Sequence, residues 1–164
     1  MSIRILAAAA LLATVALRPA LAQGKTDFSG TWKLNMEKSD PMGGRGGGGG
    51  GGGMGGMTMG PTVITQSATE LVISTSMGEQ TRKLTFALDG KESTNPGMRG
   101  GETKSKAHWD GDSLVIESST TNNGMTYTSK EVRTLSEDGK IMTVVTTRTT
   151  PNGEQTSKRV YDKQ

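Results

Sequence analysis

One segment near the start of the chain decides the fold: it reads Asp27-Phe28-Ser29-Gly30-Thr31-Trp32-Lys33-Leu34-Asn35. Its Gly-x-Trp leads into a stretch where apolar and polar residues alternate, which is the period of a β-strand with one buried face. The chain ends on a second such segment, Lys158-Arg159-Val160-Tyr161-Asp162-Lys163. Because nearly every segment between them alternates in the same way, we expect the first and last segments to close a small antiparallel barrel.

Turn signals separate the alternating segments at regular intervals. They include Asp89-Gly90, Asp110-Gly111-Asp112, Asn122-Asn123-Gly124 and Glu137-Asp138-Gly139, which are typical of tight connections between antiparallel strands. No helical pattern lies between them. The sequence therefore predicts one all-β domain over residues 23–164, an up-and-down antiparallel meander of roughly 8–10 strands closed into a barrel.

The two terminal motifs resemble those of the calycins, the group of lipocalins and intracellular fatty-acid-binding proteins. The lipocalin resemblance implies a structural role for three residues. Gly30 would let the chain approach Trp32, Trp32 would plug one end of the barrel, and Arg159 would lie across the indole ring. A guanidinium in that position contributes about 0.5–2 kcal/mol.

The resemblance to fatty-acid-binding proteins implies a binding role instead. In that family an Arg-x-Tyr near the end of the chain points inward and holds the ligand carboxylate, so Arg159 and Tyr161 would hold a polar head group. Trp32 and Phe86 are candidates for the apolar wall. The family has another Arg two strands earlier. Arg133 is the nearest match, but its spacing to the next turn differs by one residue, which predicts the other face of the strand.

Composition leaves the state of the interior open. Hydrophobic residues make up 32% of the chain and aromatic residues 4%, so large side chains are too few to fill a barrel easily. The interior holds water, or it has a ligand cavity, or one end is packed and the other is open. The resemblance implies a non-catalytic binder or carrier of a small apolar or amphipathic ligand. A scaffold or interaction protein of the cell envelope with no internal ligand is the alternative.

Residues 1–22 have the pattern of a secretory signal peptide. Arg4 precedes an apolar run, and Ala20-Leu21-Ala22 offers a small-x-small cleavage site. We therefore expect an exported protein, periplasmic or secreted, with no stable membrane span after cleavage; an uncleaved anchor is the alternative. The leader contains Arg4 and Arg18, so 17 basic residues remain against 16 acidic ones. This balance, without a clustered basic face, argues against nucleic-acid binding.

A Gly/Met-rich insert interrupts the meander at residues 37–61, with eight consecutive glycines at 46–53. Such a tract loses much backbone entropy on ordering and buries little surface, so we expect a flexible loop where a fatty-acid-binding protein carries its helical lid. Thioethers are soft ligands that suit Cu(I). An alternative function is therefore copper binding by the four methionines of this region, Met42, Met54, Met57 and Met59.

No pattern in the sequence favours catalysis or a cofactor. His108 is the single histidine and alternates with Lys104 and Lys106, as expected on a solvated strand face. The chain has no cysteine for a disulfide or thiolate metal site. The serines and threonines follow strand alternation and never form a Gly-x-Ser-x-Gly elbow. We expect a protein that is not an enzyme and that carries no cofactor.

Overall fold

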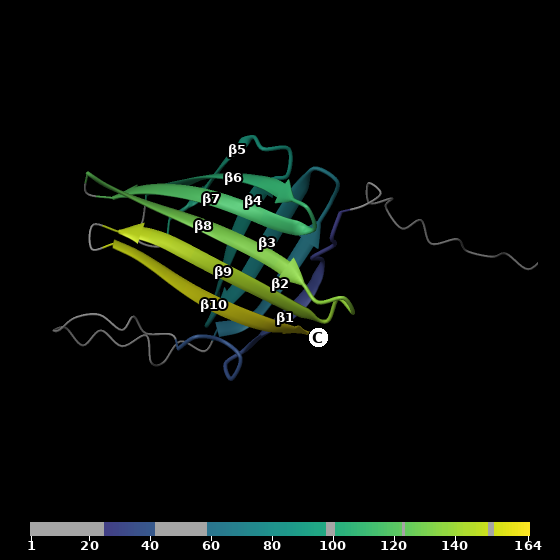
Figure 1. Ribbon diagram of the computed structural model, residues 1–164. Helices are drawn as coiled ribbons and strands as arrows, with labels where there is room; N and C mark the ends of the chain where they lie inside the picture. Colours follow the sequence, from purple (N-terminus) through teal and green to yellow (C-terminus); the bar gives the residue numbers. More distant parts are fainter. Residues whose placement is uncertain (1–24, 42–58, 98–100, 123, 151–152) are drawn as a thin grey trace, which may run out of the picture.

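Ten antiparallel strands form a single sheet that curls into a nearly closed barrel in a computed structural model of the chain (Figure 1). The structure describes residues 25–41, 59–97, 101–122, 124–150 and 153–164, so the predicted leader lies outside the described part. The strands are β1 Gly30–Asn35, β2 Met59–Gln66, β3 Glu70–Met77, β4 Gln80–Ala87, β5 Glu92–Pro96, β6 Glu102–Asp110, β7 Ser113–Asn122, β8 Met125–Leu135, β9 Ile141–Thr150 and β10 Gly153–Lys163.

Each strand except at the β4–β5 junction pairs with its neighbour in sequence, and the first strand pairs with the last. The order around the sheet is β4-β3-β2-β1-β10-β9-β8-β7-β6-β5. The β1–β10 pair places Trp32 opposite Lys163 and Leu34 opposite Tyr161. The prediction of an all-β up-and-down meander is thus confirmed, with ten strands and no helix among the described residues.

The sheet closes between β4 and β5 through side chains. The Thr85 amide donates to Asn95 Oδ1 at 2.7 Å, and Asn95 Nδ2 donates to the Thr85 carbonyl at 2.8 Å. The Ala87 amide donates to Ser93 Oγ at 2.8 Å. The Asn95 amide has the donor and acceptor of a peptide unit, so it replaces the missing backbone ladder. We call this β4–β5 junction the seam.

One end of the barrel, here called the closed end, holds the apolar core. Alternating residues of the strands point inward there and pack around Trp32 and Phe28, which are both fully buried. Trp32 Nε1 donates to the Phe28 carbonyl at 2.9 Å, and the Phe28 ring stacks on Trp109 with centroids 6.1 Å apart. Gln66 fixes this plug from β2: its side-chain amide bonds the Phe28 amide and the Thr26 carbonyl.

Both described ends of the predicted insert are built into the barrel. After β1 the chain turns, and Ser39 and Asp40 bond to β10, where the Asp40 amide donates to the Lys158 carbonyl at 2.9 Å. At the other end residues 59–61 belong to β2. The predicted bounds of 37–61 are therefore too wide. Met42, Met54 and Met57 lie outside the described residues, and the copper hypothesis stays a prediction.

Candidate functional site

Strand register divides the inner wall of the barrel into an apolar part and a hydroxyl-rich part. Near the closed end Ala107 pairs with Ile116, and Trp109 pairs with Leu114. Toward the other end, here called the far end, the same face carries cross-strand hydroxyl pairs. These are Thr62–Thr75, Thr103–Thr120 and Ser105–Ser118, with oxygens 3.2, 2.8 and 2.9 Å apart.

Arg159 and Tyr161 lie on this inner wall where the two parts meet. Arg159 pairs with Val144, and Tyr161 pairs with Met142, and both of these partners belong to the apolar core. The two side chains are partly buried. Among the described residues, neither the Arg159 guanidinium nor the Tyr161 hydroxyl has a hydrogen-bonding or ionic partner. The two predicted head-group residues therefore share a face and keep their donors unused.

The cation over the Trp32 ring is Lys163, not Arg159 as the lipocalin resemblance implied. Lys163 Nζ lies 5.3 Å from the ring centroid. Arg159 lies four residues earlier on β10, about 13 Å away along an extended strand. Gly30 makes the room: it has a φ of 140°, and a Cβ there would come within 2.7 Å of Lys163 Cε. Gly30, Trp32 and Lys163 therefore meet where β1 pairs with β10.

Trp32 and Phe86 stand in the packed part of the molecule. Trp32 is fully buried and Phe86 is 6% exposed, both within the core cluster. Phe86 pairs with Leu71 across β3 and β4 on the inner face. The partly buried hydrophobic residues packed against this cluster are Leu84, Trp109, Leu135 and Tyr161. Any ligand wall formed by Phe86 is therefore continuous with the core.

Arg133 points inward, which corrects the expectation that it would occupy the other face. It pairs with Leu114 on β7 and with Val144 on β9, so one row runs Leu114, Arg133, Val144 and Arg159. We call it the arginine row. Arg133 is 8% exposed. Its Nε and Nη2 both donate to Glu131 Oε1 at 2.5 Å, and its Nη1 lies 3.9 Å from Met142 Sδ.

The hairpin that follows Arg133 explains why the sequence pointed to the wrong face of the strand for this residue. The β8–β9 connection takes five residues, 136–140, and its ends pair as Leu135 with Met142. Inside it Ser136 Oγ donates to Asp138 Oδ1, and this bond, together with the Lys140 amide, lowers the pKa of Asp138. A loop of five residues can accommodate the one-residue difference in spacing. The face that Arg133 occupies is therefore decided by the strand register and not by its distance from the turn.

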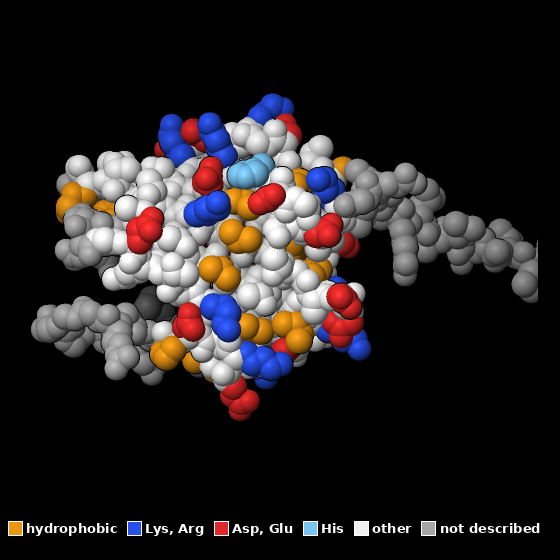
Figure 2. Space-filling model, in the orientation of Figure 1, with side chains coloured by type: hydrophobic (Ala, Val, Ile, Leu, Met, Phe, Trp, Pro, Cys, Tyr) orange, Lys and Arg blue, Asp and Glu red, His pale blue; other side chains and the backbone are white. Residues whose placement is uncertain are grey.

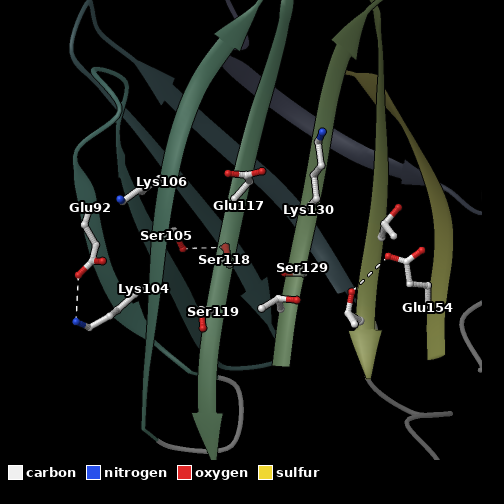
Figure 3. Close-up of a pocket in the computed structure, with 13 residues that line it drawn as sticks. Glu92, Lys104, Ser105, Lys106, Glu117, Ser118, Ser119, Ser129, Lys130 and Glu154 are labelled. Atoms are coloured by element: carbon white, nitrogen blue, oxygen red, sulfur yellow. Dashed lines mark hydrogen bonds and ion pairs between the residues drawn. The ribbon is translucent and has the colours of Figure 1, made fainter. Parts of the chain in front are cut away.

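A groove of about 660 Å³ runs along β5 to β10 (Figure 3), lined by outward-facing charged side chains and also by Ser105, Ser118 and Ser129 of the inner face. Its charged side chains point to the outer face of the sheet, away from the core. Lys106 pairs with Glu117, and Glu117 pairs with Lys130. Lys104 Nζ and Glu92 Oε1 are 3.2 Å apart beside it. Cross-strand pairs of opposite charge of this kind stabilise the face of a sheet.

The exterior has mixed charge. Figure 2 shows acidic and basic side chains interspersed over the face in view, with His108 exposed on the outside of β6. The residues that the structure describes contain no group of three or more His, Asp or Glu side chains placed to hold a metal ion. No helix in the described ranges is long and apolar enough to cross a membrane.

Comparison with known proteins reveals similarity at the level of structure only. No protein-family model and no curated protein matches the sequence. Among solved structures, a REP1-NXSQ fatty acid transporter matches with a TM-score of 0.58 and 16% identity, over 84% of this chain and 96% of that one. The zebrafish ileal bile acid-binding protein complexed with cholic acid matches with a TM-score of 0.55 and 15% identity, over 84% and 98%.

A third structure is a secretary abundant heat soluble (SAHS) protein from Ramazzottius varieornatus. It matches with a TM-score of 0.51 and 19% identity over 63% of this chain and 70% of that one. Identities this low show a common fold and leave function to be argued from the site. The similarity and the strand order agree: the chain has a calycin-like fold, a ten-stranded up-and-down barrel closed by side chains at the seam.

Proposed function

We propose that this protein is a non-catalytic binder or carrier of a small amphipathic molecule with an acidic head group. The observation that supports it is the unpartnered pair of Arg159 and Tyr161 on the inner wall. A partly buried guanidinium without a partner is costly, because burial removes water from a charge and supplies nothing in return. A ligand carboxylate would restore that interaction through two parallel hydrogen bonds, and the phenol would add a third.

The surroundings of the pair suit an amphipathic ligand. Val144 and Met142, opposite Arg159 and Tyr161, are buried apolar residues of the core, and partly buried Leu34 and Leu84 add apolar side chains to the same inner face. Solved structures of the same fold include a fatty acid transporter and a bile acid-binding protein with cholic acid. By analogy, the apolar part of a ligand would lie against these side chains, with its head at Arg159. Export, inferred from residues 1–22, is part of the same proposal.

The proposal is tested with dodecanoic acid as the probe, by calorimetry on the chain without its leader. Arg159→Gln is expected to weaken dodecanoate binding by about 1.5–3 kcal/mol, which is the range for a hydrogen bond to a charged group. Tyr161→Phe removes one neutral donor and should cost about 0.5–1.5 kcal/mol. Lys130→Gln is the matched control, since Lys130 is exposed on the outer face.

The outcomes distinguish a ligand carrier from a scaffold protein that has no internal ligand. Equal losses in Arg159→Gln and Lys130→Gln would show that the effect is one of net charge only. A wild-type protein that takes up no dodecanoate, and from which native mass spectrometry of material purified from its own host detects no small molecule, would leave the scaffold alternative. Lipid extraction of that material would identify a co-purified ligand.

A further inference from the structure

The inner wall carries an acid of its own beside the proposed head-group site. Glu131 lies two residues before Arg133 on β8 and shares its face, between Ile116 on β7 and Thr146 on β9. Its side chain is 26% exposed and that of Arg133 is 10% exposed. The pair therefore lies against the core, at the border with the hydroxyl-rich part.

Glu131 occupies the edge of Arg133 that a ligand carboxylate would use. Two guanidinium nitrogens, Nε and Nη2, both donate to one carboxylate oxygen. The remaining nitrogen, Nη1, faces the Met142 sulfur at 3.9 Å. A planar guanidinium binds carboxylates and phosphates through its paired N–H groups. With that edge taken, only the Nη1–Nη2 edge remains; Nη1 already contacts the Met142 sulfur, and the Arg133 side chain is only 10% exposed, so little of this edge is open to a second acid.

The two cations of the arginine row thus differ in state. Arg133 is neutralised by Glu131, whereas Arg159 lacks any partner among the described residues. They are two strand spacings apart, about 10 Å. The other inner-face arginines lie toward the far end: Arg148 is exposed, and Arg82 donates to the Pro96 carbonyl across the seam. The net charge beside the proposed head-group site is consequently +1.

We infer that Glu131 is a specificity-determining residue that restricts the site to amphiphiles with a single negative charge. This inference rests on the proposed function. Glu131 holds Arg133 away from ligands and repels any second anionic charge placed at Arg159. A long-chain monocarboxylate fits a site of net charge +1. A phosphate monoester, which carries nearly two negative charges above its second pKa of about 6, does not.

Three probes with one chain length test the inference at pH 8: dodecanoate, dodecyl phosphate and dodecanol. Wild type should bind dodecanoate more tightly than dodecyl phosphate. Glu131→Gln removes one like charge at about 10 Å, so affinity should rise about tenfold for each ligand charge, tenfold for the carboxylate and about a hundredfold for the phosphate. Dodecanol affinity should not change. The ratio of the two anion affinities, measured by calorimetry, should shift about tenfold.

Two further variants separate charge from folding. Glu117→Gln removes the same charge from the outer face of β7 and should leave the ratio at its wild-type value. The double variant Glu131→Gln/Arg133→Met removes both members of the pair, restores the +1 balance and should restore the wild-type preference. It also avoids leaving Arg133 buried without a partner.

The readouts distinguish the two proposals. If wild type binds dodecanoate and the anion ratio is the same in Glu131→Gln, the inference is wrong and the proposed function stands. If all three ligands, dodecanol included, weaken alike in Glu131→Gln, the residue is structural only and the inference is wrong. If wild type binds none of the three probes, the proposed function fails and the inference fails with it.

Discussion

At the scale of single residues, two of the cations on β10, Lys163 and Arg159, have separate roles. Lys163 lies over Trp32 and covers the closed end, while Arg159 faces the interior without a partner. The ammonium gains cation–π attraction, and its aliphatic stem packs beside Gly30. Stability and ligand binding are therefore expected to depend on different residues, although the two are only four positions apart.

Lys163→Met tests this division of roles. It keeps an unbranched apolar stem and removes the charge, so the free energy of unfolding should fall by about 0.5–1 kcal/mol. Urea unfolding followed by Trp fluorescence measures it. Arg159→Gln should leave the unfolding free energy unchanged or raise it slightly, because it removes a partly buried charge that has no partner among the described residues. If Arg159→Gln lowers the free energy of unfolding more than Lys163→Met does, Arg159 and not Lys163 is the cation that stabilises the barrel closure.

At the scale of elements, the seam is the one junction between barrel neighbours in the described chain that lacks a backbone ladder. Two side chains of β5, Asn95 and Ser93, take its place by bonding backbone groups of β4. Asn95 is 5% exposed, so its bonds are sheltered from water. The edges of β4 and β5 are thereby capped against pairing with other chains.

Asn95→Ala should open the seam. Both Thr85 backbone groups would lose their partners, and each buried unsatisfied group costs about 1–3 kcal/mol. We expect a lower unfolding free energy and faster hydrogen exchange at the Thr85 amide. Thr94→Ala is the control, because Thr94 is exposed on the same strand. Unchanged exchange at Thr85 in Asn95→Ala would show that the junction is held in another way.

The elements themselves were predictable from the sequence, but their lateral register was not. Alternation and Asp-Gly turns locate the strands, since both signals are local. The partner of Trp32 depends on how β1 meets β10, and no turn connects those strands to fix their register. Arg133 was misplaced because a five-residue loop can shift the count by one. Asn95 closes the seam because its side-chain amide bonds backbone groups in place of a strand. A pattern of alternating residues does not reveal such a role.

At the scale of the whole molecule, the barrel is completed by its last residues. The β1–β10 pair joins residues far apart in the chain: Asn35 pairs with Val160, and its Nδ2 donates to Asp162 Oδ2, 127 positions away, at 2.7 Å. The final residues also carry the Lys163 contact and the backbone bond from Gln164 to Thr31. Unlike the ladder inside a hairpin, this ladder depends on both ends of the chain.

Truncation after Lys158 is therefore expected to unfold the entire domain. It removes the only four residues of β10 that pair with β1, Val160–Lys163. Circular dichroism and limited proteolysis would report the loss. Removing Gln164 alone costs one hydrogen bond, about 0.5–1.5 kcal/mol, and serves as the control. A truncated chain that retained a cooperative unfolding transition would show that β1–β10 pairing is dispensable.

The same closing ladder has a consequence for the timing of folding. A ribosome releases β10 after the other nine strands, so one edge of β1 stays unpaired until β10 has been made. Contacts of such long range slow folding, since loop-closure entropy is lost before they form. We expect the barrel to stay open until β10 has been made. A chain that stays open is also one that a translocation channel can thread, so late closure would suit the export proposed above.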